Sequence, residues 1–455
     1  MTVHGWSTAS VADALGLPRG ARDHIYTGVR TDTRSAREGD LYVALLGERF
    51  DGHDFLSDAR LAGVWGVVVR RRTPSWPGFD WFEVEDTLAA YGRLARVRRD
   101  AFAGLVVAVT GTNGKTSTKE LAAAAAGAAL RVHKSEKNLN NLVGVPQTLL
   151  EMPVEAQAAL IECGANQRGE LAKMREIVRP DVVVVTNVDA GHLEGFGGIH
   201  RILEEKLSLA AEAPLAIVGP KPAHLADAAR ALARRVVTVA ADGPADWTAE
   251  DVRMRPDGHA TFRVRGVEVA LPVLGRHQVG NALLALAVAD ALGVSLVDAV
   301  RGLAAAALPG GRTVMVEREG VTVLDDTYNA NPVSVRAALD TLSASAGGAR
   351  RVVVLGDMLE LGPIAEAEHR AMGRAVAASG AAEFVGLGRA ARLAVEAARK
   401  AGLAESHHAE TFEDTVAHLL KRLAPGDAVL VKGSRGMRME RVVDALIARF
   451  GGEDG

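Results

Sequence analysis

The stretch VVAVTGTNGKTSTKE, residues 106–120, constrains the fold of this chain more than any other. An apolar run enters a loop with two glycines, and an alanine-rich helical pattern then begins at Lys115 without a spacer. Glycines allow backbone N–H groups to converge on a phosphate, and the N-terminus of a helix adds positive potential. The stretch therefore predicts a parallel α/β sheet with a phosphate-binding loop at its carboxyl edge.

The loop is shorter than the common phosphate-binding loop, because only Thr112 and Asn113 separate its two glycines. The strand and helix that such a loop requires both flank it, so we interpret it as a nucleotide site rather than an ordinary glycine turn. Lys115 is expected to neutralise phosphate charge, and the Thr116 hydroxyl to bind Mg²⁺. The expected nucleotide contacts from the loop are Gly111, Thr112, Asn113, Gly114, Lys115, Thr116 and Ser117.

The whole chain of 455 residues predicts an α/β protein of three domains. Residues 1–104 carry short strand-like runs and one helical stretch, which indicate a small α/β domain. Residues 105–311 repeat apolar strand and amphipathic helix, as in a parallel doubly wound sheet, with an antiparallel appendage expected near 247–272. The alternation restarts after the glycine-rich break LPGGRTV, so residues 312–455 predict a Rossmann-like domain.

Composition excludes several classes of function. Apolar residues make up 48% of the chain, and the net charge is −3, so no basic field exists to hold nucleic acid or anionic lipid. The sequence shows no signal-peptide pattern and no apolar run of transmembrane length, so we expect a cytoplasmic protein without stable membrane insertion. We take it to be a monomer. The single cysteine, Cys163, excludes an internal disulfide and a cysteine-rich metal cage.

Glu162 closes the apolar strand AALIE, so it is expected at the carboxyl edge of the central sheet. A lone glutamate at a strand end is by default a solvated carboxylate. With a phosphate-binding loop on a neighbouring strand, a ligand of a hard cation is the better interpretation, since magnesium prefers oxygen donors. Cys163 beside it is interpreted as a small buried residue without a catalytic role.

Further motifs follow in a fixed order along the chain. With GTNGKTS they resemble the Mur ligase family, which also includes the folylpolyglutamate synthases. The N-terminal stretch TDTRSAREGDLYVALLGERFDGHDF resembles that family's uridine-nucleotide domain. The remaining matching stretches are KNLNNLVGVPQTLL (137–150), IECGANQRGE (161–170), NVDAGHLEGFG (187–197), GRHQVGNALLAL (275–286), PGGR (309–312), DDTYNANPVS (325–334), LGDMLELG (355–362) and KGSR (432–435).

The resemblance implies ATP-dependent amide formation, in the branch of the family that adds D-alanyl-D-alanine to UDP-N-acetylmuramoyl-tripeptide during peptidoglycan precursor synthesis. ATP and two magnesium ions are the implied cofactors, and an acyl phosphate is the implied intermediate. Residues 1–104 would bind the uridine nucleotide, 105–311 ATP and 312–455 the amino substrate. The third residue of the tripeptide, diaminopimelate or lysine, is left open by the motifs.

Four residues are implied to be catalytic, namely Lys115, Glu162, His192 and Lys206. By the resemblance, Thr116 and Glu162 are magnesium ligands and His192 binds a second magnesium, although a lone histidine is more often structural. Lys206 matches a lysine that carbon dioxide converts into N6-carboxylysine, a carbamate that would bind the same metal. The alternative for Lys206 is a helix-surface lysine paired with Glu204 or Glu205.

Other substrate contacts are also carried over from the resemblance. Asn281, Arg312 and Asp326 are implied to contact the nucleotide, while Asn281 could instead make a hydrogen bond in the core. The residues implied to hold the two other substrates are Asp32, Thr33, Arg34, Arg49, Phe50, His53, Asn138 and Asn141 for the uridine-linked one, and Tyr328, Asn329, Asn331, Lys432, Ser434 and Arg435 for the dipeptide. Turn formation is the alternative for the N-terminal set and for Asn138 and Asn141.

Two other functions compete with this one. A MurE-type sister ligase usually carries the string DNPR in its last domain. This chain contains no such string, and its NANP and LGDMLELG favour the branch that adds D-alanyl-D-alanine. A nucleotide-binding regulatory protein without ligase activity is the alternative from another class. The set of Glu162, His192 and Lys206 argues against it, because a pure binder needs no second metal site. Arg312 must approach the central domain to reach ATP, so we expect hinge closure at LPGGRTV.

Overall fold

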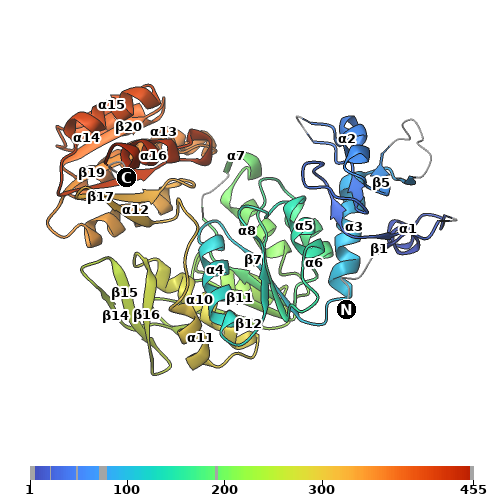
Figure 1. Ribbon diagram of the computed structural model, residues 1–455. Coiled ribbons are helices and arrows are strands. Elements are labelled where there is room, and N and C mark those ends of the chain that lie inside the picture. The colour runs from blue at the N-terminus through green and yellow to red at the C-terminus, as the bar shows by residue number, and fades with distance from the viewer. Residues whose placement is uncertain (1–5, 21, 48–49, 71–78, 190–192, 451–455) are drawn as a thin grey trace.

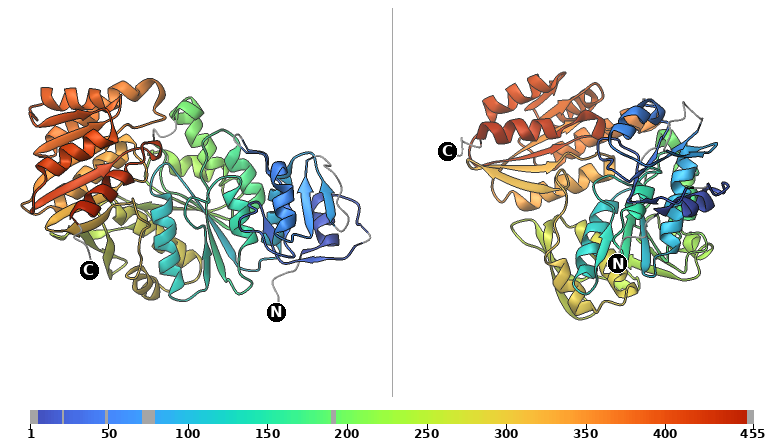
Figure 2. Two further views of the ribbon diagram at one scale, coloured as in Figure 1. Left: turned by 45° about the horizontal axis from the view of Figure 1, so that its top comes forward. Right: turned by 45° about the vertical axis from the view of Figure 1, so that its right-hand side comes forward.

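The structure, a computed structural model, describes residues 6–20, 22–47, 50–70, 79–189 and 193–450. It confirms the expected α/β class with three domains (Figure 1). The left view of Figure 2 shows the domains in a row, with the N-terminal and C-terminal domains on opposite sides of the central one. Within the described ranges, no helix is both long and apolar enough to cross a membrane.

The N-terminal domain contains a parallel four-stranded sheet in the order β3-β4-β5-β6 and a separate antiparallel pair, β1-β2. Its core is formed by apolar strand residues such as Leu41 and Val68, packed against Tyr91 and Leu94 of α3. The elements are β1 (Trp6–Ser7), α1 (Thr8–Leu15), β2 (Ile25–Tyr26), β3 (Val29–Arg30), β4 (Leu41–Val43), η1 (Gly52–Phe55), α2 (Leu56–Leu61), β5 (Gly66–Val69), β6 (Asp80–Glu83) and α3 (Thr87–Asp100).

The central domain is built on seven parallel strands in the order β13-β12-β11-β10-β7-β9-β8. The inner strands are continuous apolar runs because helices cover both faces of the sheet. The strands are β7 (Leu105–Thr110), β8 (Val132–Lys134), β9 (Ala158–Glu162), β10 (Val182–Val185), β11 (Leu215–Val218), β12 (Val236–Ala240) and β13 (Trp247–Thr248).

Two helical layers enclose this sheet. One core joins α4, α10 and α11 to one face, and a second core joins α5, α6, α8 and α9 to the other. The helices are α4 (Lys115–Gly127), α5 (Gly144–Leu150), α6 (Glu170–Val178), α7 (Leu193–Phe196), α8 (Ile199–Ser208), α9 (Leu225–Arg230), α10 (Gln278–Ala291) and α11 (Leu296–Leu303).

The antiparallel appendage is present but begins later than expected. It consists of β14 (Glu250–Met254), β15 (His259–Val264) and β16 (Val267–Leu274). Trp247 and Thr248 belong instead to the central sheet, where they pair parallel to β12, so the expected start at 247 is wrong. The free edge of β12 offers backbone N–H and C=O groups that need hydrogen-bond partners, and two residues are enough to pair with them. So short a strand shows no alternation of apolar and polar residues in the sequence.

The C-terminal domain has a six-stranded sheet in the order β17-β18-β22-β19-β20-β21, parallel except for β17. Helices α12, α13 and α14 cover one face, and α15 and α16 cover the other. The elements are β17 (Val314–Arg318), β18 (Val321–Asp326), α12 (Pro332–Ser345), β19 (Arg350–Gly356), η2 (Gly362–Ile364), α13 (Ala365–Ala378), β20 (Glu383–Leu387), α14 (Ala391–Lys400), β21 (Ser406–Ala409), α15 (Phe412–Arg422), β22 (Asp427–Lys432), η3 (Arg435–Met437) and α16 (Glu440–Phe450).

Each outer domain contacts the central one through specific elements. Helix α3 packs against α5 and α6, and the buried Arg99 side chain donates to Val178 O at 2.8 Å and pairs with Asp181 at 2.8 Å. On the other side the appendage meets α12, where a Cβ on Gly258 would lie 2.7 Å from Ser345. Figure 1 shows the appendage in yellow-green beneath the orange C-terminal domain.

Candidate active site

The sheet register brings three strand ends together at one edge. Glu162 pairs with Val109 of β7, and Val185 of β10 pairs with Thr110 on the other side. The phosphate-binding loop, residues 111–114, follows β7 and therefore lies between the ends of β9 and β10. Parallel α/β sheets bind ligands at such a carboxyl edge.

Two glycines allow the loop to take its shape. Gly111 has φ of 145° and Gly114 has φ of 80°, both in the region that side chains rarely adopt. A Cβ on Gly111 would lie 2.0 Å from the Thr186 hydroxyl, and one on Gly114 would lie 2.5 Å from Asn281 Oδ1. The loop is therefore packed tightly between β10 and α10, and only glycine fits at either position.

Lys115 is the first residue of α4, and its ammonium group folds over the loop. Its Nζ donates to the carbonyl oxygens of Gly111 at 2.9 Å and Thr112 at 3.2 Å. Burial lowers the pKa of Lys115; Glu162 opposes this shift, and the positive charge of Arg312 adds to it. A phosphate bound in the loop would replace these two carbonyl contacts with a stronger, charge-assisted interaction.

Thr116 and Glu162 form the most specific pair in the site. The Thr116 hydroxyl donates to Glu162 Oε2 at 2.7 Å, and Asn140 Nδ2 donates to Glu162 Oε1 at 2.9 Å. The Glu162 side chain is only 2% exposed, so its carboxylate is fixed at the end of β9 beside the loop. A hydroxyl and a carboxylate oxygen at this separation form a donor set that suits Mg²⁺, which prefers oxygen ligands and keeps several waters.

The loop backbone is held by the segment that follows β10. Asn113 O accepts from the Thr186 hydroxyl at 2.5 Å and from Asn187 Nδ2 at 3.0 Å, while Asn113 N donates to Asn187 Oδ1 at 3.0 Å. Sequence reasoning missed Asn140, Thr186 and Asn187. The positions of Thr186 and Asn187 directly after an apolar strand were a usable signal, because strand ends share the same edge of the sheet.

Lys206 lies inside the protein, which contradicts the surface alternative. Its side chain is 2% exposed on α8, with Nζ 5.9 Å from the centre of the Phe196 ring. Burial lowers the pKa of Lys206 to about 7, and the positive charge of Lys115 adds to the effect. At neutral pH a large share of Lys206 is therefore an uncharged amine, the form that reacts with carbon dioxide.

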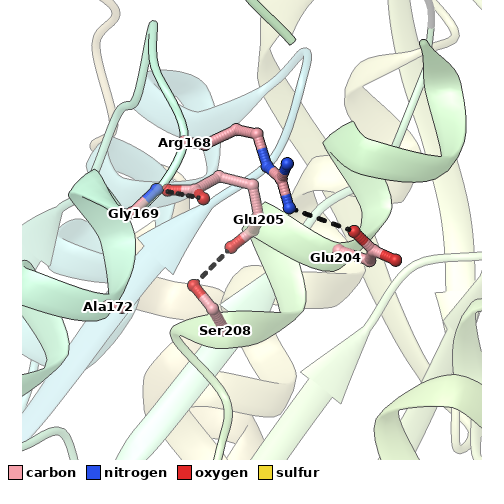
Figure 3. Close-up of a pocket in the computed structure, with 6 residues that line it drawn as sticks. All are labelled: Arg168, Gly169, Ala172, Glu204, Glu205 and Ser208. Carbon is pink, nitrogen blue, oxygen red and sulfur yellow. Dashed lines mark hydrogen bonds and ion pairs between the residues drawn. The ribbon is translucent and has the colours of Figure 1, made fainter. Parts of the chain in front are cut away.

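A hollow of about 470 Å³ is lined by residues of α6 and α8 and by the two residues before α6 (Figure 3). Its lining residues are Arg168, Gly169, Ala172, Glu204, Glu205 and Ser208, none of them an expected site residue. Glu205 accepts from the backbone N–H groups of Gly169 at 2.7 Å and Leu171 at 2.8 Å. Glu205 therefore fastens α8 to the start of α6, and this contact helps to fix Lys206 one residue further on.

Asn331 of the C-terminal domain contacts the phosphate-binding loop directly. It is the N-cap residue of α12, and its Nδ2 donates to Asn113 Oδ1 at 2.6 Å. Arg312 lies nearby with its guanidinium 3.8 Å over the Tyr328 ring. Among the described residues, Asn113 Nδ2 and Arg312 Nε are two of the buried polar atoms without a hydrogen-bond partner. Two such atoms beside the loop fit a site that binds a polar ligand.

The remaining C-terminal residues form one hydrogen-bonded group at the ends of β18 and β22. Lys432 Nζ pairs with Asp326 Oδ2 at 2.5 Å and donates to Asn329 O at 2.7 Å. Asn329 Oδ1 accepts from Arg435 N at 3.3 Å, and Ser434 Oγ donates to Ala330 O at 3.3 Å. The structure thus brings the expected dipeptide residues together at one sheet edge, although their individual roles stay predictions.

Other expected residues occupy local structural positions. Asn281 lies against the loop, with Nδ2 donating to Gln278 at 2.8 Å. Asn141 Oδ1 accepts from the N–H groups of Val143 and Gly144 at the start of α5, and Asn138 is exposed in the same loop. Asn141 thus makes the turn contacts given above as the alternative, and its substrate contact stays a prediction.

In the N-terminal domain, Asp32 and Arg34 form an exposed ion pair of 2.6 Å across a turn that includes Thr33. Phe50 is 72% exposed. His53 is buried, with Nδ1 2.5 Å from Asp51 and Nε2 accepting from Arg70 N, so both ring nitrogens are occupied. Two further expected residues, Arg49 and His192, lie outside the described residues.

The fold and the site together define a class. The protein is a three-domain P-loop nucleotide-binding protein, in which the last domain contacts the phosphate-binding loop of the central one. Two family matches cover most of this architecture: the Mur ligase middle domain matches residues 109–289, and the Mur ligase, glutamate ligase domain, matches residues 311–435.

Individual relatives match over nearly their whole length. The UDP-N-acetylmuramoyl-tripeptide--D-alanyl-D-alanine ligase of Escherichia coli (strain K12) is 36% identical over 96% of this chain and 97% of its own. Among solved structures, MurF from Acinetobacter baumannii superposes with a TM-score of 0.88 at 31% identity, covering 98% of this chain and 100% of that one. MurF ligase from Thermotoga maritima in complex with ADP has a TM-score of 0.82 at 27% identity, covering 93% and 98%. The chain belongs to the Mur ligase family.

Proposed function

We propose that this protein is the ATP-dependent ligase that adds D-alanyl-D-alanine to UDP-N-acetylmuramoyl-tripeptide in cytoplasmic peptidoglycan precursor synthesis. The observation that carries the proposal is the hydrogen bond between Thr116 and Glu162 beside Lys115. Relatives that match this chain over nearly their whole length are named for the same activity. The ADP complex of the Thermotoga maritima structure supports ATP as the nucleotide.

The reaction proceeds in two steps. A terminal carboxylate oxygen of the tripeptide attacks the γ-phosphorus of ATP, the bond to the bridging oxygen breaks, and ADP leaves with an acyl phosphate remaining. The amine of D-alanyl-D-alanine then attacks the acyl carbon, loses a proton, and expels inorganic phosphate. Two anions meet in the first step, so the site must supply positive charge where they meet.

The chain's own residues meet this requirement in a small volume. Lys115 and the backbone N–H groups of residues 111–114 would hold the β- and γ-phosphates, and Arg312 would add a second positive charge from the C-terminal domain. Thr116 and Glu162 would hold a magnesium ion, which supplies charge neutralisation and orientation of the phosphate oxygens. Because Asn113 and Asn331 connect the two domains, docking of the C-terminal domain is coupled to the shape of the loop.

Lys206 would act as a carbamate. Carbon dioxide adds to its uncharged amine with loss of a proton, which converts a buried base into a two-oxygen anion. That anion, with His192, would hold a second magnesium ion. We assign the uridine nucleotide to residues 1–104, ATP to 105–311 and the dipeptide to 312–455.

Phosphate release separates this proposal from its two competitors. With UDP-linked tripeptide and MgATP, we expect release that depends on added D-alanyl-D-alanine. Release that is indifferent to both substrates indicates a regulatory nucleotidase. Release that requires UDP-N-acetylmuramoyl-dipeptide and a single amino acid, in place of the tripeptide and D-alanyl-D-alanine, indicates a MurE-type ligase. Tripeptides that end in diaminopimelate and in lysine are compared in parallel.

A further inference from the structure

Lys119 is a buried charge that the proposed chemistry does not use. It lies one turn after Thr116 on α4, and its side chain is 0% exposed. A lysine ammonium is almost never fully buried unless it is paired, because removing it from water is costly. Its contacts therefore show what the charge is for.

The ammonium group of Lys119 connects α4 to the strand next to Glu162. Its Nζ donates to the carbonyl oxygen of Ser135, directly after β8, and pairs with Glu120 Oε1 at 2.8 Å. The second oxygen of Glu120 pairs with Lys134 of β8. Ser135 is 1% exposed, and its hydroxyl accepts the backbone N–H of Glu162 at 3.0 Å.

These contacts close a ring around the expected magnesium ligands. The Thr116 hydroxyl donates to the Glu162 carboxylate at 2.7 Å. One turn further along α4, the Lys119 ammonium group donates to the carbonyl oxygen of Ser135. The Ser135 hydroxyl in turn accepts the backbone N–H of Glu162. Glu162 is thus fixed to α4 at its side chain directly and at its backbone through Ser135. Such outer contacts set the orientation of a metal ligand.

We propose that Lys119 is a positioning residue for the cation site: through Ser135 it fixes Glu162 relative to Thr116, so that magnesium meets a preformed pair of oxygen ligands. The inference rests on the proposed function only in that Glu162 and Thr116 bind the cation. The contacts of Lys119 are with Ser135 and Glu120, and we assign neither of these residues to nucleotide or substrate binding.

The test measures nucleotide affinity without requiring turnover. ATP binding to the full chain is measured by calorimetry with Mg²⁺ and with EDTA, for the wild type, Lys119→Met, Ser135→Ala and Lys134→Met. We expect Lys119→Met and Ser135→Ala to weaken the affinity gained from Mg²⁺ by about tenfold, as for other groups that orient a metal ligand. Affinity in EDTA should change little. Lys134→Met removes an equal charge from the same cluster but leaves the contact between Lys119 and Ser135. Its affinity for ATP with Mg²⁺ should therefore resemble that of the wild type.

The possible results have distinct meanings. Equal losses in Lys119→Met and Lys134→Met, or a loss of the same size in EDTA, would show a general charge effect and overturn the proposal. The proposal is also overturned if Ser135→Ala gains as much ATP affinity from Mg²⁺ as the wild type does. Ser135→Ala is the milder substitution, so it provides the test if Lys119→Met does not fold. If the wild type itself gains no affinity from Mg²⁺, the cation site in the proposed function fails instead.

Discussion

Lys206 shows how burial gives one side chain a chemistry that its sequence context hides. In the stretch ILEEKLSLAAE it follows two glutamates, and at the surface it would remain a cation at neutral pH. The structure places it inside, where burial and Lys115 lower its pKa to about 7. The environment of the amine, rather than its neighbours in sequence, lowers its pKa.

Replacement of Lys206 by alanine should lower turnover by at least about 100-fold, because the loss of a mere outer contact to a metal ligand already costs about 10- to 100-fold. A short carboxylic acid such as acetate or propionate should restore part of the activity, because it can supply the two oxygens of the missing carbamate. Turnover is measured with and without the acid. An alanine variant with full activity removes the carbamate from the account.

The lowered pKa also predicts a pH dependence of stability in buffer depleted of carbon dioxide. The pKa of unmodified Lys206 is about 7 in the folded state against an ordinary value of 10.5, so the unfolded chain binds the extra proton between these values. Burial of this lysine therefore lowers the free energy of unfolding by its full amount below about pH 7. The loss becomes smaller as the pH rises towards 10.5. It amounts to roughly 5 kcal/mol at most.

Lys206→Met should accordingly unfold at a higher temperature than the wild type at pH 6, with the difference closing towards pH 10. Thermal unfolding at several pH values measures this. A difference that does not change with pH would contradict the assigned protonation of Lys206.

At the residue scale, the sequence predicted part of this site from strand ends. Glu162 and Thr116 were predicted because a strand end and a helix start place them at one edge of the sheet, and the structure brings them into contact. Lys119 and Asn140 were not predicted. Their roles depend on contacts with Ser135 and Glu162 across the sheet, and such contacts leave no local pattern in the sequence.

At the scale of elements, the loop between β7 and α4 depends on its glycines for packing as well as for backbone freedom. Ala at position 111 would place a Cβ 2.0 Å from the Thr186 hydroxyl at φ of 145°. We expect Gly111→Ala to weaken ATP binding by about 100-fold, since an ångström-scale displacement of a positioning group has effects of that size. ATP affinity is measured by calorimetry.

Gly127 provides a matched control at the other end of the same helix. A Cβ there meets nothing within 4 Å, so Gly127→Ala should leave ATP affinity unchanged and alter stability by no more than about 1 kcal/mol. Equal effects of the two substitutions would show that the loop tolerates a side chain at position 111.

Long apolar strands and the helices between them were predictable because both faces of the sheet are covered. The short strands β8, β12, β17 and β21 were not predicted, and Trp247 was assigned to the wrong sheet. These strands lie at or beside the edges of their sheets, where neighbouring strands rather than their own patterns determine the pairing.

At the scale of the whole molecule, the site is divided between two domains. Asn113 and Asn331 join them by a hydrogen bond of 2.6 Å, and Arg312 belongs to the segment that links them. We expect ATP and UDP-linked tripeptide together to shift the C-terminal domain about the segment 308–314 and to reduce the radius of gyration. Small-angle scattering measures this change, and superimposable curves with and without ligands would contradict it.

The central claim is that the chain activates a peptide carboxylate by transferring the γ-phosphoryl group of ATP to it. The most direct test supplies tripeptide with ¹⁸O in its terminal carboxylate and follows the released phosphate by mass spectrometry. Because the second step breaks the bond between the acyl carbon and a carboxylate oxygen, we predict that each phosphate released with product carries one oxygen from the peptide. Product formation with unlabelled phosphate would contradict the account.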